Sequence, residues 1–553
     1  MRKLLSVILV LVTMLSVFSV TASAETSAKG IFDDETYYDV LIDDVYYLLE
    51  NGVGAVTGFD MDLDDTSPKA GITIPETVTY GGKDFTIIMI FDMAFMECDY
   101  TSITLPSTIT YIGDGAFMSS PYLEKVVIPN DCEFEYFGAE VFTGTPFEAE
   151  IYSKDETIFG KNVLFSYIGN ADEYVIPENI NIIVPKAFFM SGIKNIVFNN
   201  NVTDIPAYAF ASCRNLTEVT IPDAVTVIAD GAFMDCFNLE KINFGENVWM
   251  ICEDAFANTK IKSIHLGINV AQITGAFKNC NMLESITIEP GNTSFVTDGN
   301  AVYQKTNISE GYKTREVLML EYYIPSKAQG DINLKSDVYV ISDYAFYGCK
   351  NIGEVKANEL THIGYSAFEN SSITKFSANG DYYIFDSAFK NCKNLQSINL
   401  ENIRYIDTAA FENCTSLKNV TFSKDIAYIG PLAFSNTGLT EVVIYGDYCE
   451  IHEGAFKNCA NLQSVRLEEG VYYVGMDAFL GCPKLETIYL SKTVKSFAEN
   501  AFNGCDNVTF ELVKGTDAYD YIDDNTDFNI ETVGRYSLWQ RIIDFFRALF
   551  GLD

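Results

Sequence analysis

The chain has 553 residues, a formal net charge of −39 at pH 7, 14 % aromatic residues and 20 % charged residues. A chain this acidic is repelled by nucleic-acid phosphates, which argues against a nucleic-acid partner. Its aromatic residues supply ample core material, which excludes a disordered acidic tail.

Residues 1–24 have the pattern of a secretory signal peptide. Two basic residues precede an apolar run, and Ala22 and Ala24 stand as in an A-x-A cleavage site. The alternative, a retained transmembrane anchor, needs about 20 apolar residues and usually different flanks. We therefore expect cleavage near Ala24 and a secreted or cell-surface protein.

The segment 25–90 differs in composition from the rest of the chain. It contains the strand-like runs "YYDVLIDDVYYLL" and "VTYGGKDFTIIMI", the second of which includes a Gly-Gly turn. A solenoid needs a cap over its first open coil. We expect this segment to be a β-rich N-terminal cap.

An internal repeat dominates the remaining sequence. Its mark is an Ala-Phe pair, and most successive pairs are 21 to 23 residues apart. The phenylalanines are Phe95, Phe117, Phe188, Phe210, Phe233, Phe256, Phe277, Phe346, Phe368, Phe389, Phe411, Phe434, Phe456, Phe479 and Phe502, with Phe142 in a Val-Phe variant. Longer gaps of 46 and 69 residues indicate divergent copies or hairpin insertions. A period of this length is typical of a solenoid.

One well-formed copy, residues 213–233, reads "CRNLTEVTIPDAVTVIADGAF". The alternation in this copy predicts a short strand in which Val219 and Ile221 face inward and Thr220 faces outward. Pro222 should end that strand, because proline cannot donate to a ladder. No single copy can enclose its own apolar side chains, so the copies must stack around one continuous core.

These residues resemble the leucine-rich repeats of the BspA-like family, whose consensus is C-x-x-L-x-x-I-x-L-P-x-x-L-x-x-I-x-x-x-A-F. The resemblance implies a repeat solenoid of the leucine-rich-repeat class. Short parallel strands should occupy one face, with irregular or β structure on the others. The solenoid is expected over residues 91–512, with divergent or hairpin-like copies near 143–178 and 289–337.

The cysteines follow the same period. Ten of the thirteen lie three residues after a repeat phenylalanine: Cys98, Cys213, Cys236, Cys280, Cys349, Cys392, Cys414, Cys459, Cys482 and Cys505. Export favours disulfides, but stacked coils hold side chains in parallel about 4.8 Å apart, too far for a disulfide and not convergent enough for zinc. Shorter copies carry Ser191, Thr259, Ser371 or Thr437 at this position. We therefore predict small buried core residues and free thiols.

Ligand binding on a solenoid should use outward positions that repeat along the axis. The residue between the two inward strand positions forms one such row, and none of its members is acidic. The candidates in this row are Thr220, Asn243, His265, Asn399, Thr421, Arg466 and Tyr489. Hydroxyl and amide groups suit a protein or glycan ligand. The alternative is that Thr and Val are simply good strand residues.

A second row lies six residues before the phenylalanine and is rich in tyrosine: Tyr111, Tyr136, Tyr383, Tyr405, Tyr428 and Tyr473. Three of them, at 383, 405 and 428, fall on successive coils, so their rings should align. Such rings can anchor a partner or stack on sugars. They can equally serve only to stabilise neighbouring coils.

The C-terminal part departs from the repeat. Residues 513–534 are expected to form a terminal coil. Residues 535–553 include "LWQRIIDFFRALFGL", whose apolar residues follow helical spacing, so we expect an amphipathic helix too short to span a bilayer. It could cap the solenoid, lie in a membrane interface or contact a partner.

The sequence offers little support for catalysis. Its three histidines, His265, His362 and His452, are about four or more coils apart, and no Walker A loop, G-x-S-x-G or H-E-x-x-H motif occurs. We expect no enzymatic activity, metal or cofactor. The family resemblance implies a bacterial adhesin that binds an extracellular protein or glycan. We expect the chain to be a monomer. The alternatives are a polysaccharide-capture module and a structural envelope component.

Overall fold

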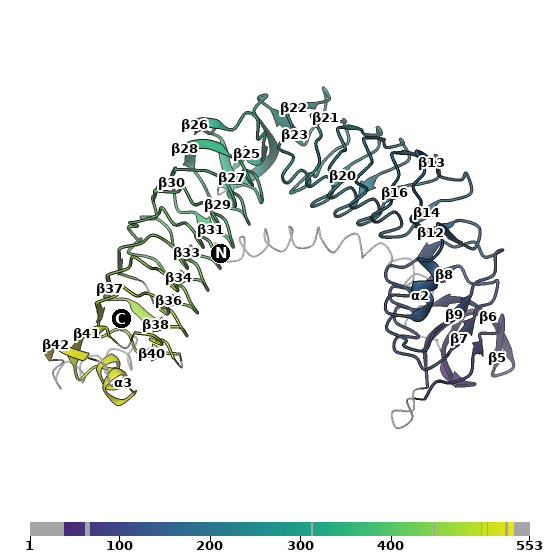
Figure 1. The fold of residues 1–553 in the computed structure, drawn as a ribbon, viewed down its shortest axis with the longest axis horizontal. Coiled ribbons are helices and arrows are strands. Elements are labelled where there is room, and N and C mark those ends of the chain that lie inside the picture. Colours follow the sequence, from purple (N-terminus) through teal and green to yellow (C-terminus); the bar gives the residue numbers. More distant parts are fainter. Residues whose placement is uncertain are drawn as a thin grey trace. The chain divides into compact units, whose positions relative to one another are not determined.

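A computed structural model describes residues 38–60, 67–310, 313–446, 448–498, 500–505, 507–525 and 529–535. The chain divides into two compact units, unit 1 up to Cys236 and unit 2 from Phe237 onward. Both are built almost entirely of short strands joined by turns (Figure 1). The expected signal peptide and the expected C-terminal helix over 535–553 lie outside the described residues, apart from Arg535 at the end of the last strand.

Unit 1 begins with antiparallel strands and continues as a parallel solenoid. Its strands are β1 (Tyr38–Ile42), β2 (Val45–Glu50), β3 (Val53–Phe59), β4 (Ile72–Thr73), β5 (Thr77–Tyr80), β6 (Lys83–Ile90), β7 (Ser102–Thr104), β8 (Tyr111–Ile112), β9 (Lys125–Val127), β10 (Tyr136–Phe137), β11 (Glu156–Phe159), β12 (Val163–Tyr167), β13 (Glu173–Val175), β14 (Ile182–Ile183), β15 (Asn195–Val197), β16 (Asp204–Ile205), β17 (Glu218–Thr220) and β18 (Val227–Ile228). Its one described helix is α2 (Pro146–Ile151).

Unit 2 continues the same alternation of strands. They are β19 (Lys241–Asn243), β20 (Met250–Ile251), β21 (Ser263–Leu266), β22 (Ser285–Ile288), β23 (Phe295–Thr297), β24 (Ala301–Glu310), β25 (Lys313–Tyr323), β26 (Gln329–Asn333), β27 (Val338–Ile341), β28 (Asn351–Glu359), β29 (His362–Ile363), β30 (Lys375–Asn379), β31 (Tyr383–Ile384), β32 (Ser397–Ile398), β33 (Tyr405–Ile406), β34 (Tyr428–Ile429), β35 (Glu441–Ile444), β36 (Cys449–Ile451), β37 (Ser464–Leu467), β38 (Val471–Val474), β39 (Thr487–Leu490), β40 (Ser496–Phe497), β41 (Thr509–Lys514) and β42 (Asn529–Arg535). Helix α3 (Asp517–Asn525) lies between the last two strands, within the segment expected to be a terminal coil.

Most coils carry two strands, which belong to different sheets. In unit 2 an eleven-stranded sheet runs in the order β23-β24-β25-β27-β29-β31-β33-β34-β36-β38-β40, and from β27 onward its strands lie just before the Ala-Phe pairs. We call it the ladder sheet. The earlier strands of these coils belong chiefly to the sheets β26-β28-β30-β32 and β35-β37-β39-β41-β42. The labels in Figure 1 trace these two series as separate rows along unit 2.

The predicted strand alternation is confirmed in the copy at 213–233. Val219 and Ile221 are buried, whereas Glu218 and Thr220 are exposed. The Ala-Phe pair closes each coil in the same way, because the phenylalanine amide donates to the alanine carbonyl of the next coil, as from Phe389 to Ala410 at 2.8 Å. Small alanine side chains let the coils approach this closely.

The phenylalanine rings stack along the axis of each unit. In unit 2 the centroids of Phe368 and Phe389 are 4.9 Å apart and the ring planes differ by 3°. The spacing is 5.3 Å for the next pair, Phe389 and Phe411. These rings are fully buried, so this stack is the centre of the continuous core.

Residues two positions after the phenylalanine adopt a left-handed backbone, for which asparagine is well suited. Asn391, Asn413 and Asn436 have φ values of 60°, 63° and 56°. The side-chain amide of Asn413 donates to Asn391 at 2.9 Å, and that of Asn436 donates to Asn413 at 2.7 Å. This asparagine ladder satisfies polar groups at the turn and fixes the register of adjacent coils.

The cysteine row is buried, as predicted. All thirteen cysteines are free; twelve are buried, and Cys252 is partly exposed. The Cys414 thiol donates to the carbonyl of Phe389 in the preceding coil at 3.1 Å. In a serine copy, the Ser191 hydroxyl donates to a carbonyl of the preceding coil, that of Gly169, at 3.1 Å. A small side chain with one donor is therefore what this position requires.

The two divergent stretches contain hairpins, one of the alternatives expected from the gaps. β11 pairs antiparallel with β12, and β24 with β25. The second strand of each hairpin ends in a tyrosine that takes the place of the repeat phenylalanine. Tyr167 lies 5.5 Å from Phe188, and Tyr323 stacks at 4.9 Å on Phe346.

Candidate binding surface

Four tyrosines and one histidine form a row on the ladder sheet of unit 2. The rings of Tyr383 and Tyr405 stack with centroids 5.4 Å apart and planes 24° apart. Tyr405 and Tyr428 are 6.5 Å apart with planes tilted by 35°. The predicted alignment of these three tyrosines is confirmed. We call the row Tyr383, Tyr405, Tyr428, His452 and Tyr473 the aromatic ladder.

His452 fills the coil between Tyr428 and Tyr473. Its ring lies 4.6 Å from the ring of Tyr428 and 5.9 Å from that of Tyr473. The strand position in this coil is occupied instead by Glu450, which is in register with both tyrosines. The Glu450 carboxylate accepts a hydrogen bond from His452 Nε2 at 3.3 Å. The spacing that defines the row does not select His452, because this residue lies two positions beyond the one six residues before the phenylalanine.

Strand register positions the ladder. Tyr405 pairs with Tyr428, and Ile406 with Ile429, in parallel strands. Alternation turns the isoleucines into the core, where both are buried, and the tyrosines toward solvent. Tyr383 and Tyr405 are 43 % and 40 % exposed, so these side chains are accessible to a partner.

A glycine lets neighbouring coils approach closely beneath the ladder. A Cβ on Gly430 would lie 2.8 Å from the backbone of Asp407 and 3.1 Å from the ring of Tyr428. Any larger residue there would push the coil or the ring away. Gly430 therefore helps to set the position of the Tyr428 ring.

The ladder stands in an acidic environment. Burial, followed by the charges of Asp407 and Glu450, raises the pKa of the Tyr428 hydroxyl. The phenol is thus a neutral hydrogen-bonding group at physiological pH, with two carboxylates close by. An acidic, hydroxyl-bearing strip of this kind suits hydrogen-bond donors and cations.

The candidates on the first-strand row lie on other sheets than the ladder. Thr220, Asn243, His265, Asn399 and Thr421 are exposed, as expected for outward positions. Asn399 follows β32, whereas Tyr405 belongs to β33 in the ladder sheet. The structure therefore does not bring these polar residues together with the tyrosines into one site.

His265 has both ring nitrogens engaged. Nδ1 lies 3.0 Å from the Thr287 hydroxyl, and Nε2 lies 3.0 Å from the carboxylate of Glu289. A hydroxyl, an imidazole and a carboxylate are the components of a hydrolytic triad. Here the imidazole is largely exposed, with its side chain 57 % accessible, so the group lies on an open strand face instead of in a substrate pocket.

Arg466 and Tyr489 are in contact on adjacent strands. The guanidinium lies 4.2 Å from the centroid of the Tyr489 ring. Its Nε donates to Glu468 at 2.9 Å, and Nη1 lies 3.5 Å from Glu511. Glu511 continues the row beyond Tyr489. The first-strand row therefore has an acidic member at this end. The charge of Arg466 is neutralised by Glu468 and Glu511 of the same chain.

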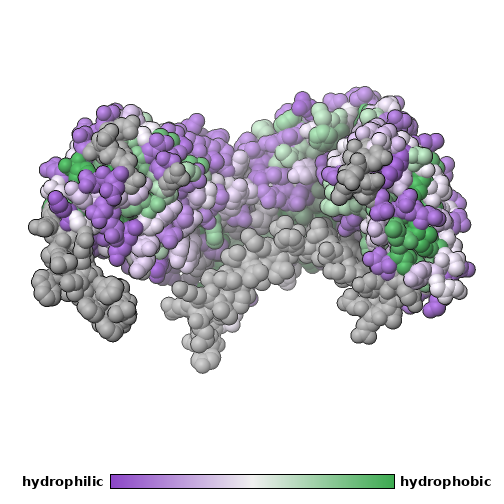
Figure 2. Space-filling view, turned by 90° about the horizontal axis from the view of Figure 1, so that it is seen from below, coloured by the Kyte–Doolittle hydropathy of each residue, from purple (hydrophilic) through white to green (hydrophobic). Residues whose placement is uncertain are grey.

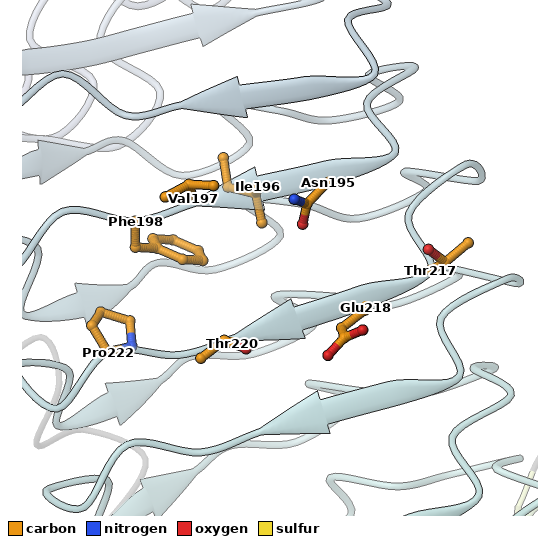
Figure 3. Close-up of a pocket in the computed structure, with 8 residues that line it drawn as sticks. All are labelled: Asn195, Ile196, Val197, Phe198, Thr217, Glu218, Thr220 and Pro222. Carbon is orange, nitrogen blue, oxygen red and sulfur yellow. The ribbon is translucent and has the colours of Figure 1, made fainter.

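Thr220 lines a shallow depression of about 460 Å³ in unit 1 (Figure 3). Val197 and Phe198 form its apolar part, and Asn195 and Glu218 are among its polar residues. Figure 3 shows these side chains spread over two neighbouring strands, β15 and β17, without converging on a point. The depression provides contact area and lacks the enclosure of a small-molecule site.

The described residues hold neither a cluster of metal ligands nor a membrane-spanning helix. No group of three or more His, Cys, Asp or Glu side chains there could hold a metal ion. Within the same residues, no helix is long and apolar enough to cross a membrane. The face shown in Figure 2 is mainly hydrophilic, with apolar residues in small separate patches. Such a surface agrees with the excess of acidic residues.

Comparison with solved structures gives matches to other leucine-rich-repeat proteins. A leucine-rich cell surface protein from Faecalibacterium prausnitzii is 22 % identical, over 92 % of this chain and 97 % of its own, with a TM-score of 0.30. The pneumococcal vaccine antigen PcpA is 17 % identical, over 90 % and 99 %, with a TM-score of 0.36. A protein from Eubacterium ventriosum is 24 % identical, over 62 % and 90 %, with a TM-score of 0.42.

No curated protein matches the chain. The model of one protein family, described as the BspA-type leucine-rich-repeat region in six copies, matches residues 88–217, 203–324, 326–437 and 382–509. Together these matches cover most of the chain and nearly all of its repeats. The chain therefore belongs to the BspA-type leucine-rich-repeat family.

Proposed function

We propose that this chain is an exported, non-catalytic binding protein of the adhesin kind, and that the aromatic ladder is its main contact surface for an extracellular protein. The observation that carries the proposal is the run of partly exposed aromatic side chains from Tyr383 to Tyr473. Tyrosine combines a rigid apolar ring with a polar end, and it is enriched among residues that dominate binding energy.

The stacking geometry favours a protein partner over a glycan. Sugars bind aromatic residues by stacking on an open ring face. In the ladder the inner rings face one another, with centroids 5.4 Å apart at Tyr383 and Tyr405, which leaves no room for a sugar between them. What the ladder offers is mainly ring edges and hydroxyl groups, with one wider step between Tyr405 and Tyr428. These groups fit the mixed apolar and polar surface of a protein.

Export is proposed on the signal-peptide pattern of residues 1–24. Expression of the full chain in a secreting bacterium, with sequencing of the mature N-terminus, tests it. Cleavage near Ala24 is expected. The envelope-component alternative is tested by fractionating cells that make the chain with and without residues 535–553; release that depends on this deletion would favour that alternative.

The binding proposal predicts a specific loss in the variant Tyr383→Ser/Tyr405→Ser/Tyr428→Ser. Removing aromatic contacts should weaken capture of an immobilised matrix protein by roughly tenfold or more. The melting temperature should hardly change, because these rings lie outside the core. Measurements are surface plasmon resonance against panels of matrix proteins and glycans, together with calorimetry.

The matched control is Tyr122→Ser/Tyr445→Ser, which removes tyrosines that are 36 % and 47 % exposed and lie outside the ladder. It should bind as the wild type does. Loss of binding and stability together in the triple variant would show that the ladder only supports its coils. Binding to glycans alone would favour polysaccharide capture.

A further inference from the structure

Some basic side chains of this protein contact a tyrosine ring and a carboxylate at the same time. The Arg466 guanidinium lies over the ring of Tyr489, and Glu468 accepts a hydrogen bond from its Nε–H at 2.9 Å. Lys278 repeats the arrangement: its Nζ lies 3.9 Å from the centroid of the Tyr344 ring. The same ammonium lies 2.9 Å from Glu253 and 2.8 Å from Asp254.

A third case adds the phenol oxygen as a partner. Arg315 lies 4.7 Å from the centroid of the Tyr339 ring and also donates to its hydroxyl oxygen. That hydroxyl in turn donates to Glu359 at 3.1 Å. Ring face and phenol oxygen thus act on one guanidinium directly, and the carboxylate acts on it through the phenol.

The aromatic ladder has the same components. Tyr428 lies beside Asp407 and Glu450, whose charges act on its hydroxyl. The step from Tyr405 to Tyr428 is the widest of the ladder, at 6.5 Å and 35°, so these two rings shield each other less than their neighbours do. Arg404, which precedes Tyr405, is engaged in an interaction within the chain. Among the described residues, no lysine or arginine lies over a ladder ring.

The spacing of the ladder fits an extended peptide. Neighbouring strands are about 4.8 Å apart, so five rings span roughly 19 Å. An extended chain rises about 3.3 Å per residue and turns every second side chain to one side. About six residues therefore cover the ladder, with three side chains facing it. The net charge of −39 favours the approach of a basic segment.

We infer that the aromatic ladder binds an extended, arginine-rich segment of its partner, with a guanidinium group at the wide step between the Tyr405 and Tyr428 rings and paired with Asp407 and Glu450. The inference rests on the proposed function and specifies the chemistry of the partner. Arginine is preferred to lysine, because only a planar guanidinium can stack on a ring while its N–H groups reach phenol and carboxylate oxygens.

Fluorescence anisotropy of labelled hexa-arginine, hexa-lysine and hexa-glutamine with the full mature chain tests the inference. Hexa-arginine should bind most tightly, and its affinity should fall as salt increases. The variant Tyr405→Ser/Tyr428→Ser has the same charge as the wild type. It should bind hexa-arginine about tenfold more weakly, because stacking contributions of this size are typical of partly desolvated cation–π pairs.

The control variant Tyr122→Ser/Tyr445→Ser should bind hexa-arginine as the wild type does. Equal binding of hexa-arginine to the ladder variant and the wild type would overturn the inference, because attraction would then come from bulk charge. Equal affinity for hexa-lysine and hexa-arginine would overturn it as well. If the ladder variant loses capture of a matrix protein but keeps hexa-arginine binding, the proposed function stands and only the inference falls.

Discussion

At Cys414, a residue suggestive of redox or metal chemistry serves packing. Its thiol is buried and donates to the Phe389 carbonyl of the preceding coil. Thr437 occupies the same position in the next coil and donates to a carbonyl of its own coil. The exchange of Cys with Ser and Thr between copies of the repeat therefore correctly indicated a core role. A position that accepts all three residues needs a small side chain and does not need a thiolate.

Thiol reactivity should follow this burial. Burial raises the pKa of Cys213, and likewise of Cys392, to about 12, so almost no thiolate exists at pH 8. We expect the native protein to react slowly with a thiol reagent, with partly exposed Cys252 the fastest. In denaturant all thirteen thiols should react.

Counting the reactive thiols by absorbance with Ellman's reagent, with and without denaturant, checks this prediction. A denatured count well below thirteen would reveal disulfides and contradict it. Rapid reaction of many thiols in the native protein would show that the cysteine row is not a buried core element.

The aromatic ladder shows what a repeat pattern reveals about single residues. Equal spacing placed Tyr383, Tyr405 and Tyr428 on one face, since register carries the period into space. The repeat spacing does not identify His452, because its ring reaches the row from a different position of the coil. Contacts between positions that are not equivalent in the repeat depend on side-chain direction, which the period alone does not define.

Among the elements, the hairpins depart most from the repeat. The gap before Phe346 indicated an insertion, but no sequence pattern shows that Tyr323 takes the phenylalanine position. In hairpin β24–β25, Tyr322 also donates to the Phe277 carbonyl at 3.0 Å. The hairpin therefore continues the core while its strands extend beyond their neighbours. Helix α3 was likewise missed, because the repeat consensus ends before it.

The β24–β25 hairpin introduces one buried acid, Glu321. The Ser342 hydroxyl donates to it at 2.8 Å and the Thr274 hydroxyl at 3.0 Å. Burial raises its pKa from 4.5 to about 7 in spite of these bonds. The unfolded chain therefore loses this proton at lower pH than the folded chain. The contribution of Glu321 to the free energy of unfolding should fall as pH rises from about 4.5 to about 7, by about 3 kcal/mol.

Glu321→Gln removes this titration while keeping an acceptor oxygen. The difference in free energy of unfolding between variant and wild type should grow in favour of the variant between pH 4.5 and 7, and then stay level. Urea denaturation at several pH values measures it. A pH-independent difference would contradict the assignment. Glu401→Gln, at an exposed carboxylate of the same unit, is the control.

At the scale of the whole molecule, each coil contacts chiefly its neighbours. Stability should then be a sum of coil and interface contributions, and damage should remain local. Phe411, stacked 5.3 Å from Phe389 and 5.0 Å from Phe434, is a suitable probe in unit 2. Its counterpart in unit 1 is Phe210, stacked at 4.6 Å on Phe188.

Phe411→Ala should lower the local free energy of unfolding by about 3–5 kcal/mol, since it opens a cavity in the ring stack. Hydrogen exchange should accelerate in the coils from 389 to 434 and stay unchanged over residues 88–217. Phe210→Ala should give the converse pattern. A uniform acceleration over the whole chain in either variant would contradict nearest-neighbour stability.

The sequence by itself determined the repeat, its inward and outward positions, the burial of the cysteine row and the alignment of three tyrosines. These follow from periodicity, because identical copies stacked in register must present identical faces. Only the tertiary structure decided that the polar first-strand row and the tyrosines belong to different sheets, that Arg466 is neutralised by Glu468 and Glu511, and that His452 completes the aromatic ladder. Those results depend on side chains meeting across coils at positions that the repeat does not relate.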